Sequence, residues 1–338
     1  MIVAQPGAMI VSLDFELYWG VHDVISLDKY QHNLIGVQQA IEQMLQLFTD
    51  HNIQATWAIV GLLYCHNKKE INKFKPALTP NYTNEKLSAY HLIENKLKED
   101  DDSRFYFAPT LINQIAQTPH QEIATHTFSH YYTLEPEQTL AQFTADLDAA
   151  IRIAKMHNHT VSSIIFPRNQ INKAYLQACF DKGITAYRGN ERGIIYNIKQ
   201  NERKRYWKRG MRFIDRYINL TGHQTYPIQE VGENKLHNIP ASRFLNPYSS
   251  SLVMFERVRL RRIKRAMTYA AKHGEVFHLW WHPHNFGIHL TKNMSVLEDI
   301  LQHYVLLKEQ YGFISKNMTT ILSENNTINK ITTEENII

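Results

Sequence analysis

Two histidines that lie four residues apart could hold a metal ion. His126 and His130 enclose the sequence TFS, and the apolar residues Ile123 and Ala124 just before them fit a short buried strand. In one helical turn, or in a tight loop that leads into one, positions i and i+4 lie on the same face, so both imidazoles can reach one ion. A catalytic zinc usually takes three protein ligands and keeps one position open. A carboxylate from elsewhere in the chain is therefore expected at this site.

Other polar residues of the right chemistry follow apolar, strand-like runs. They are Asp14 and Glu16 after 9–13, Arg168 after 161–166, and His282 and His284 after 275–281. Parallel strands of a barrel bring their carboxyl ends to one rim, so these groups are expected to meet there. Two imidazoles and one carboxylate suit zinc or a similar divalent ion. A second carboxylate, kept ionised by Arg168, could act as a general base, and a late histidine could protonate a leaving amine. These are the parts of metal-assisted amide or ester hydrolysis.

The elements that must position these groups alternate between strands and helices. Strands are predicted at 9–14, 53–60, just before His126, at 161–166, 184–187, 275–281 and around Phe313; helices are predicted at 29–51, 110–117, 137–157, 172–182, 201–220, 250–273 and 293–311. This alternation predicts a parallel sheet with right-handed crossovers, and a single core favours a closed or incomplete barrel over an open sheet. Residues 221–248, which contain three prolines, are expected to be irregular.

The chain is predicted to form one domain. Its 338 residues and 43% hydrophobic content are ample for a single large core, and no linker or fixed-period repeat divides it. We assign residues 1–325 to this domain and place a polar insertion, at about 61–105, at the mouth of the fold. The polar residues 326–338 are expected to form a loose C-terminal tail.

Composition excludes several other classes of protein. Cys65 and Cys179 are far apart, so neither a disulfide framework nor a thiolate metal site is indicated. No apolar run of about eighteen residues and no leader-like start is present, so a cytoplasmic location is expected. The net charge is +5, with basic residues concentrated in 201–216 and 257–265. These blocks could be solvated helix faces, which we favour, or could contact phosphates or an anionic glycan. No nucleic-acid motif is present.

Four motifs together resemble the polysaccharide deacetylase family, the NodB-homology group of carbohydrate esterases. They are SLDFE (Ser12 to Glu16), HTFSH (His126 to His130), FPRN (Phe166 to Asn169) and WWHPHN (Trp280 to Asn285). The resemblance implies a distorted barrel of about seven strands. It also implies that Asp14 is the catalytic base, that Glu16, His126 and His130 bind the metal, that Arg168 is the partner of the base, and that His282 is the catalytic acid. The usual reaction of the family removes an N-acetyl or O-acetyl group from a glycan.

The motifs also depart from the family pattern. The acids are spaced as Asp-x-Glu instead of being adjacent, and FPRN replaces the usual arginine-proline order. No segment matches the fourth motif, whose aspartate orients the acid histidine. Because His282 and His284 both follow the last long strand, either could be the acid.

These observations lead to one main hypothesis about function. It is a cytoplasmic deacetylase that uses a divalent metal, expected to be zinc, and acts on an amino-sugar glycan or its nucleotide- or lipid-linked precursor in surface polysaccharide assembly. The basic helices would then suit a phosphate-bearing carrier or an anionic membrane surface. The alternatives are a small-molecule amidohydrolase on the same scaffold and a non-catalytic glycan-binding or assembly protein. The sequence leaves the oligomeric state open.

Overall fold

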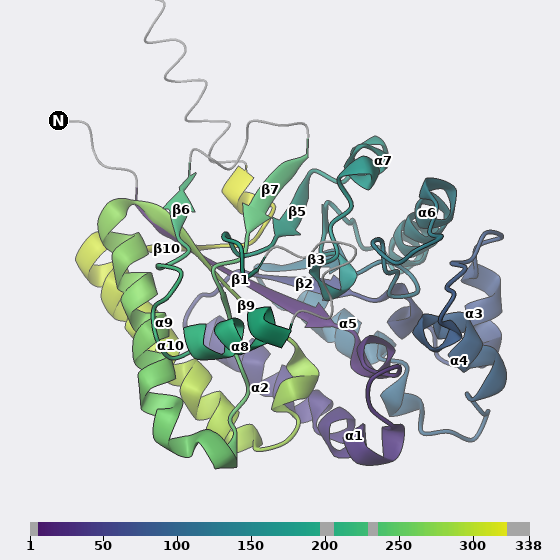
Figure 1. The fold of residues 1–338 in the computed structure, drawn as a ribbon, viewed down its shortest axis with the longest axis horizontal. Helices are drawn as coiled ribbons and strands as arrows, with labels where there is room; N and C mark the ends of the chain where they lie inside the picture. Colours follow the sequence, from purple (N-terminus) through teal and green to yellow (C-terminus); the bar gives the residue numbers. More distant parts are fainter. Residues whose placement is uncertain (1–5, 197–205, 229–235, 323–338) are drawn as a thin grey trace, which may run out of the picture.

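The computed structural model describes residues 6–196, 206–228 and 236–322 (Figure 1). Within these residues ten strands form one sheet. The strands are β1 (Ala8–Phe15), β2 (Ala55–Ile59), β3 (Gln121–Thr125), β4 (Ser163–Ile164), β5 (Ala186–Gly189), β6 (Tyr226–Pro227), β7 (His237–Pro240), β8 (Arg243–Phe244), β9 (Glu275–Trp281) and β10 (Ile314–Lys316).

The sheet is mostly parallel and curls into a half-barrel. Its order is β6-β9-β1-β2-β3-β4-β5-β7, with β10 also on β1 and β8 also on β9, and only the β6–β9 pair is antiparallel among the described strands. The segment 237–244 pairs first with β5 and then with β9, so it connects the two ends of the curled sheet. The predicted distorted (β/α) barrel is confirmed in this form.

Alternation along β1 separates the outer core from the barrel interior. Met9, Val11 and Leu13 belong to the large hydrophobic cluster that contains the buried faces of the helices. Ala8 and Ile10 belong to a second cluster, which includes alanines of β2, β3 and β5. Because side chains of a strand alternate between its faces, Ser12 and Asp14 share the face of Ala8 and Ile10 and so lie inside the barrel.

Helices cover the outside of the sheet (Figure 1). They are α1 (Leu27–Ile35), α2 (Val37–Asp50), α3 (Lys68–Phe74), α4 (Ala89–Asn95), α5 (Pro109–Gln117), α6 (Leu140–Met156), α7 (Leu176–Asp181), α8 (Tyr206–Asp215), α9 (Val253–His273) and α10 (Leu290–Tyr311). Local signals fix several of their ends. A capping box at Thr139 and Gln142 begins α6, and Gly274 and Gly312 end α9 and α10 in the left-handed conformation.

The single helix predicted at 29–51 is divided at Gly36 into α1 and α2. A Cβ atom on Gly36 would lie 2.0 Å from the carbonyl oxygen of Gly287, so the chain needs glycine for this close approach. The contact presses the α1–α2 junction against the 3-10 turn Pro283–Phe286, which follows β9. Asn33 strengthens it by donating a hydrogen bond of 3.2 Å from Nδ2 to the carbonyl oxygen of His284.

The prediction that residues 221–248 are irregular is wrong, because β6, β7 and β8 lie in this range. These strands have only two to four residues, which is too short to show a hydrophobic period in the sequence. They pair with β5 and β9, which are distant in the chain, so their formation depends on those partners. Pro227 and Pro240 lie at strand ends, where a missing N–H is tolerated.

The predicted division of the chain into one domain, an insertion and a tail stays a prediction. The expected insertion at about 61–105 contains α3 and α4, while its assignment, like that of 1–325 as one domain, stays a prediction. The expected tail 326–338 lies outside the described residues, as do the first residues of the helix predicted at 201–220. In the described part of the chain, none of the helices has both the length and the apolar composition that a membrane crossing requires.

Candidate active site

The two predicted metal-binding histidines lie in a tight loop that follows β3. His126 comes directly after the strand and donates its backbone N–H to the carbonyl of Ile59 on β2, at 2.8 Å. Thr127 and His130 both have positive φ angles, of 63° and 57°, so the loop turns sharply without forming a helix. Thr127 Oγ1 accepts the N–H of Tyr131 at 2.7 Å and so closes the turn. This bend brings His126 and His130 within reach of one point, as predicted from their spacing.

A buried carboxylate on α6 holds this loop in place. Asp146 Oδ1 accepts the backbone N–H of Phe128 at 2.7 Å, and Oδ2 accepts the hydroxyl of Ser129 at 2.5 Å. Asp146 is fully buried, and this burial raises its pKa to about 6, against the opposing hydrogen bonds from Ser129 and Phe128. The loop geometry therefore depends on a side chain sixteen residues or more away from either histidine, which the sequence motif does not contain.

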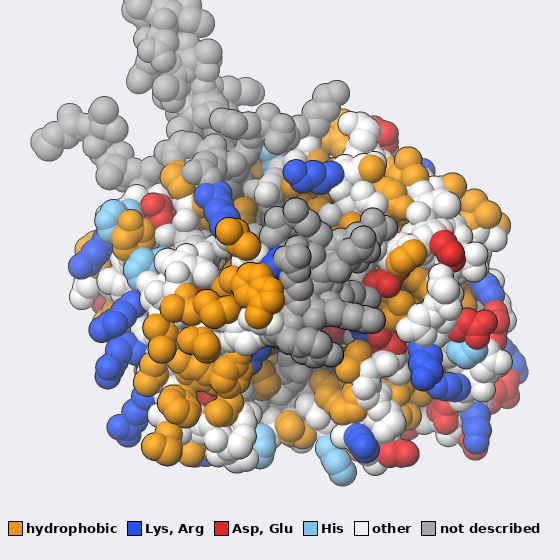
Figure 2. All heavy atoms as spheres, in the orientation of Figure 1, with side chains coloured by type: hydrophobic (Ala, Val, Ile, Leu, Met, Phe, Trp, Pro, Cys, Tyr) orange, Lys and Arg blue, Asp and Glu red, His pale blue; other side chains and the backbone are white. Residues whose placement is uncertain are grey.

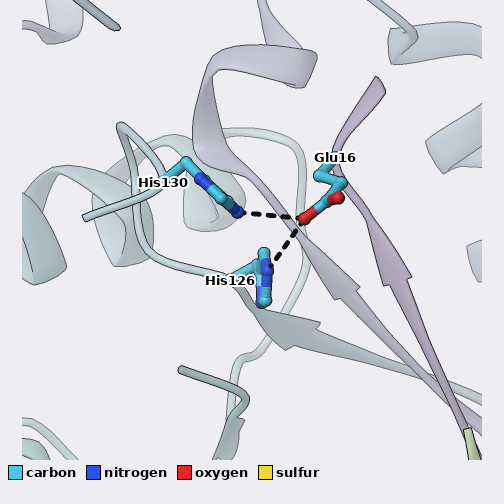
Figure 3. A group of neighbouring side chains, drawn as sticks. All are labelled: Glu16, His126 and His130. Atoms are coloured by element: carbon cyan, nitrogen blue, oxygen red, sulfur yellow. Dashed lines mark hydrogen bonds and ion pairs between the residues drawn. The ribbon is translucent and has the colours of Figure 1, made fainter. Parts of the chain in front are cut away.

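Glu16, His126 and His130 form one buried cluster (Figure 3). Their ligand atoms lie within 4.8 Å of one another. Glu16 Oε2 is 2.9 Å from Nε2 of His130 and 3.3 Å from Nε2 of His126. The structure thus brings together the three residues that were predicted as metal ligands, from the end of β1 and from the loop after β3.

The cluster fits a divalent metal ion. His126 Nδ1 lies 2.8 Å from the carbonyl of Ile165, an acceptor, so Nδ1 carries a proton, and in the neutral imidazole Nε2 then has a free lone pair. That buried Nε2 has no hydrogen-bond partner among the described residues, and it faces the Glu16 carboxylate. A lone pair facing an anion in a buried site is unfavourable unless a cation lies between them. Two imidazole nitrogens and one carboxylate oxygen are a donor set that zinc accepts.

The surroundings of Glu16 keep it ionised and in place. Burial raises the pKa of Glu16, but the positive charge of His282 and the N–H groups that His126 and His130 present when protonated outweigh burial and lower the pKa well below its ordinary value. A Cβ atom on Gly20 would lie 2.0 Å from the Glu16 carboxylate, so the absence of a side chain there leaves room for it. This room is a property of the turn Leu17–Gly20 that directly follows Glu16.

Asp14 is held by an arginine that was not predicted to contact it. Arg188, at the end of β5, donates two hydrogen bonds to Asp14, from Nη1 at 2.6 Å and from Nη2 at 2.8 Å. Burial raises the pKa of Asp14, but the charge and hydrogen bonds of Arg188 outweigh it, so the pKa is lowered overall. Ser12 Oγ and Asn169 Oδ1 accept further hydrogen bonds from Arg188, and its guanidinium lies 4.0 Å from the ring centre of Trp280.

Arg168, the predicted partner of Asp14, lies elsewhere. Its guanidinium pairs with Asp23 and lies 4.5 Å from the ring centre of Tyr132. Its φ of 54°, directly after Pro167, turns the chain so that Asn169 of the same motif reaches Arg188 instead. The contact predicted between Arg168 and Asp14 is therefore corrected to Arg188. A signal for Arg188 was present in the sequence, because it follows the strand predicted at 184–187 as Arg168 follows 161–166.

Of the two late histidines, His282 is better placed to reach a substrate. Its side chain is 22% exposed, and Nε2 lies 3.7 Å from Asp14 and 3.6 Å from Glu16. His284 is almost fully buried, with Nε2 3.8 Å from Glu16. Burial lowers the pKa of His284 to about 3, which disfavours the protonated form that an acid catalyst needs. Phe244 and Trp280 contact the His282 ring and fix its position.

A cavity of about 610 Å³ opens over these groups. Its lining includes Asp14, Glu16 and His282 together with the aromatic side chains of Trp280 and Phe244. It also includes four arginines, which are Arg209 and Arg212 of α8, Arg216 directly after α8, and Arg243 of β8. A cavity of this size suits a ligand of one or two sugar rings with a substituent.

The fold and the site together define a class of protein. It is a mostly parallel half-barrel with a carboxylate–histidine cluster at the carboxyl ends of its strands. Residues 28–187 match the model of the polysaccharide deacetylase family. The match confirms the resemblance to this family that the motifs indicate. It supports a hydrolase that removes acyl groups, and a glycan as its substrate class.

Solved structures show the same fold at low sequence identity. A Mycobacterium smegmatis protein, provisionally described as a polysaccharide deacetylase, is 12% identical, covers 97% of this chain and 93% of its own, and gives a TM-score of 0.59. A probable polysaccharide deacetylase from Pseudomonas aeruginosa is 12% identical, with coverages of 93% and 89% and a TM-score of 0.51. An allantoinase is 10% identical, with coverages of 93% and 88% and a TM-score of 0.53. A comparison with curated protein sequences finds no match.

Proposed function

We propose that the protein is a zinc-dependent deacetylase that hydrolyses the acetamido or acetyl ester group of an amino-sugar glycan or its precursor. The observation that carries this proposal is the buried cluster of Glu16, His126 and His130 beside a second, ionised carboxylate, Asp14. The similarity to the polysaccharide deacetylase family supports the acyl transfer to water, and the donor set supports the metal.

The residues of the site divide the reaction between them. Glu16, His126 and His130 would hold the ion, which supplies Lewis-acid activation of the acyl carbonyl when bound. Asp14, kept ionised by Arg188, accepts the proton of the attacking water. His282 lines the same cavity, with Nε2 3.7 Å from Asp14, and donates a proton to the leaving nitrogen or oxygen of the sugar. The C–N or C–O bond then breaks, giving acetate and the free amine or alcohol.

Arg168 has a separate position in this scheme. It lines the cavity, and its guanidinium lies over the ring of Tyr132, whose hydroxyl is 3.0 Å from Nδ1 of His130. We propose that Arg168 supports the metal ligand His130 through Tyr132 and closes one side of the substrate site. Because the Arg168 guanidinium pairs with Asp23 and Asp14 is held by Arg188, Arg168 is not the partner of the base.

Two other functions are less well supported. A small-molecule amidohydrolase would use the same groups, but likeness to an allantoinase at 10% identity concerns the fold alone. A non-catalytic glycan-binding protein would not need a base and a full ligand set, and all of these residues are present and assembled here. The cytoplasmic location and the place in surface polysaccharide assembly stay predictions from the sequence.

The test is acetate release from a panel of acetylated sugars by the purified, zinc-loaded protein. The panel contains free, oligomeric and phosphate-linked acetamido sugars together with O-acetylated glycans. We expect acetate from at least one class, and release at least about 10²-fold slower from an Asp14→Asn variant that retains its metal. Release of ammonia from small cyclic amides, with no acetate from any sugar, would favour the amidohydrolase instead.

A further inference from the structure

Three arginines on one face of α8 line the cavity of the active site. Arg209, Arg212 and Arg216 follow one another at intervals of three and four residues, so they project from one side of the helix and the turn after it. In the described part of the chain, none of the three has a carboxylate within the 4.0 Å of an ion pair. Burial lowers the pKa of Arg216, as expected for a cation that loses water without gaining an anion.

A fourth arginine on β8 adds an independent observation. Arg243 is only 6% exposed, and its Nη1 donates to Asp215 at 2.8 Å. Its Nε and Nη2 are buried and have no hydrogen-bond partner among the described residues. Asp215 is shared, because Arg262 of α9 also pairs with it at 2.8 Å. One carboxylate thus faces two guanidinium groups, and positive charge is left over beside the cavity.

We propose that these arginines form an anion subsite, so that the substrate is an acylated sugar that carries a phosphate or diphosphate group. This inference rests on the proposed function and names the substrate class of that site. A guanidinium binds phosphate oxygens with paired N–H donors, and the buried N–H groups of Arg243 lack an acceptor that such a group would supply. Glu191, which also lines the cavity and accepts the Trp280 indole N–H at 3.1 Å, is one carboxylate against these four arginines. A neutral polysaccharide would leave the arginines unmatched.

Titration calorimetry in an Asp14→Asn background, which is expected to bind without hydrolysis, tests the subsite without turnover. The probes are N-acetylglucosamine and N-acetylglucosamine 1-phosphate, added to this background, called the unchanged protein here, and to the same background with Arg212→Gln and Arg216→Gln, called the double variant. The matched control is Lys69→Gln with Lys73→Gln, which removes two exposed cations from α3, outside the cavity. We expect the phosphate to tighten binding at least tenfold in the unchanged protein and in the control, and at most about twofold in the double variant.

Two outcomes would overturn the subsite: no preference for the phosphate, or a preference that survives in the double variant. The proposed function fails separately, through the absence of acetate from every sugar while phosphate-dependent binding persists. The source of the phosphate is decided by a further arm that compares a nucleoside diphosphate sugar with the same sugar on a prenyl diphosphate in detergent micelles. The preferred source will show the lower KM, and Arg212→Gln with Arg216→Gln will raise that KM.

The outer side of the same helix carries a separate feature, a continuous exposed apolar patch. It consists of Trp207, Phe213, Ile214, Ile218 and Leu220 of α8 and the turn after it, with Val253, Met254, Phe255 and Val258 of α9. Ring contacts of Phe213 with Tyr217 and of Tyr217 with Phe255 join the two helices, at 5.6 and 5.4 Å between ring centres. Figure 2 shows hydrophobic side chains gathered over α8 and the adjoining part of α9, with basic side chains at their border.

From this patch we infer a second property, that the protein docks onto an anionic lipid surface through α8 and the start of α9. Met254 is 85% exposed and Ile218 is 59% exposed, which is costly in water and favourable in a bilayer interface. Arg257, Arg261 and Arg265 are exposed on α9 beside the patch, and no ion pair is recorded for them among the described residues. Apolar side chains bordered by free cations are the charge pattern that complements acidic phospholipids.

Vesicle sedimentation tests this surface. Vesicles of phosphatidylcholine alone and with one-third phosphatidylglycerol are spun with the unchanged protein, with Met254→Ser plus Phe255→Ser, and with Met156→Ser as a control at an exposed methionine of α6. We expect binding to the acidic vesicles only, at least a fivefold lower bound fraction in the double variant, and no change in the control. Equal sedimentation of the double variant would overturn the inference. So would a dimer in solution that the double variant converts to monomer, because the patch would then join two copies.

Discussion

Two buried carboxylate–arginine clusters each contribute a residue to the lining of the cavity, Asp14 in one and Arg243 in the other, and they differ in charge balance. Asp14 is matched by one arginine, Arg188, through two hydrogen bonds. Asp215 is divided between Arg243 and Arg262, and also accepts the hydroxyl of Tyr196 at 2.7 Å. The first cluster is neutral, and one of its buried N–H groups, Nε of Arg188, has no partner among the described residues. The second has two cations for one carboxylate, and Nε and Nη2 of Arg243 and Nε of Arg262 have no partner there, so it can bind an anion.

The difference shows that a buried ion pair does not by itself indicate what a site does. Both aspartates have lowered pKa values because neighbouring arginines outweigh the effect of burial. What separates them is the number of donors left over and the groups nearby. Asp14 has the metal cluster beside it, with His282 bridging the two at 3.7 and 3.6 Å. Asp215 has the basic face of α8, of which it is the last residue.

The largest effect is expected from replacement of Asp14. Asparagine keeps the shape of the side chain but cannot accept a proton from water, so Asp14→Asn should lower kcat by about 10²- to 10⁴-fold. Metal content should not change, since Asp14 is not in the cluster of potential ligands. Steady-state acetate release together with elemental analysis checks both statements. An active Asp14→Asn enzyme would show that another group accepts the proton.

The variants Arg188→Met and Arg168→Met test which arginine is the partner of the base. The sequence predicted Arg168, whereas the structure has Arg188 in contact with Asp14. Arg188→Met leaves Asp14 buried without its partner, and we expect a loss of activity of roughly 10- to 100-fold. Arg168→Met should lose less, because Arg168 contacts Asp23 and Tyr132 and leaves Asp14 matched. Acetate release by the two variants side by side measures the difference. If Arg168→Met proved the more damaging, the assignment of Arg188 to the base would be contradicted.

Asp215→Asn tests the second cluster through stability. The change leaves two buried arginines facing each other without an anion, and we expect it to lower the free energy of unfolding by about 3–5 kcal/mol. Adding Arg262→Met should recover part of this loss, because one of the two cations is then removed. Chemical denaturation of the single and double variants provides the comparison. An additive double variant would mean that Asp215 and Arg262 are not coupled in the way their 2.8 Å contact implies.

Asp146 extends the comparison to a buried carboxylate that has no arginine. Its pKa is raised to about 6 by burial, so the folded state holds the proton more tightly than the unfolded chain does. The stabilisation linked to this group is therefore complete below its unfolded pKa and is lost as the pH rises through about 6. From pH 7 to pH 5 the unfolding free energy of the unchanged protein should rise by about 1 kcal/mol relative to Asp146→Asn.

Denaturation curves of both proteins across this pH range measure that effect. The difference between them cancels contributions from other titrating groups that the variant does not disturb. A difference that stays flat from pH 7 to pH 5 would mean that Asp146 remains ionised in the folded protein throughout. Its hydrogen bonds to Phe128 and Ser129 would then outweigh the cost of its burial.

Much of the fold and the predicted cluster could be predicted because the relevant signals are local. The apolar run of β1 ends at Asp14 and Glu16, and the spacing of His126 and His130 encodes a shared direction. What could not be predicted depends on distant partners. The strands β7 and β8 exist because β5 and β9 offer unpaired edges, and no pattern within 237–244 indicates them.

The choice between two arginines also escaped the sequence. Arg168 and Arg188 both follow predicted strands, and only the backbone turn after Pro167 decides that Arg168 points to Asp23. Arg188 shares the inward face of β5 with Ala186, which packs in the interior cluster, so alternation alone directs it toward Asp14. Prediction of the Arg188–Asp14 contact would have required the register of β5 in the sheet. That register is set by pairing with β4 and β7.

The central claim is that Glu16, His126 and His130 hold a catalytic metal, and metal content tests it most directly. Elemental analysis of the purified protein after zinc reconstitution is combined with acetate release. His126→Ala is the variant, and His273→Ala, at an exposed histidine near the end of α9, is the control. We predict about one zinc ion per chain in the unchanged protein and in the control, and loss of both metal and activity in His126→Ala. A protein that stays free of metal after reconstitution, or a His126→Ala variant that keeps it, would contradict the account.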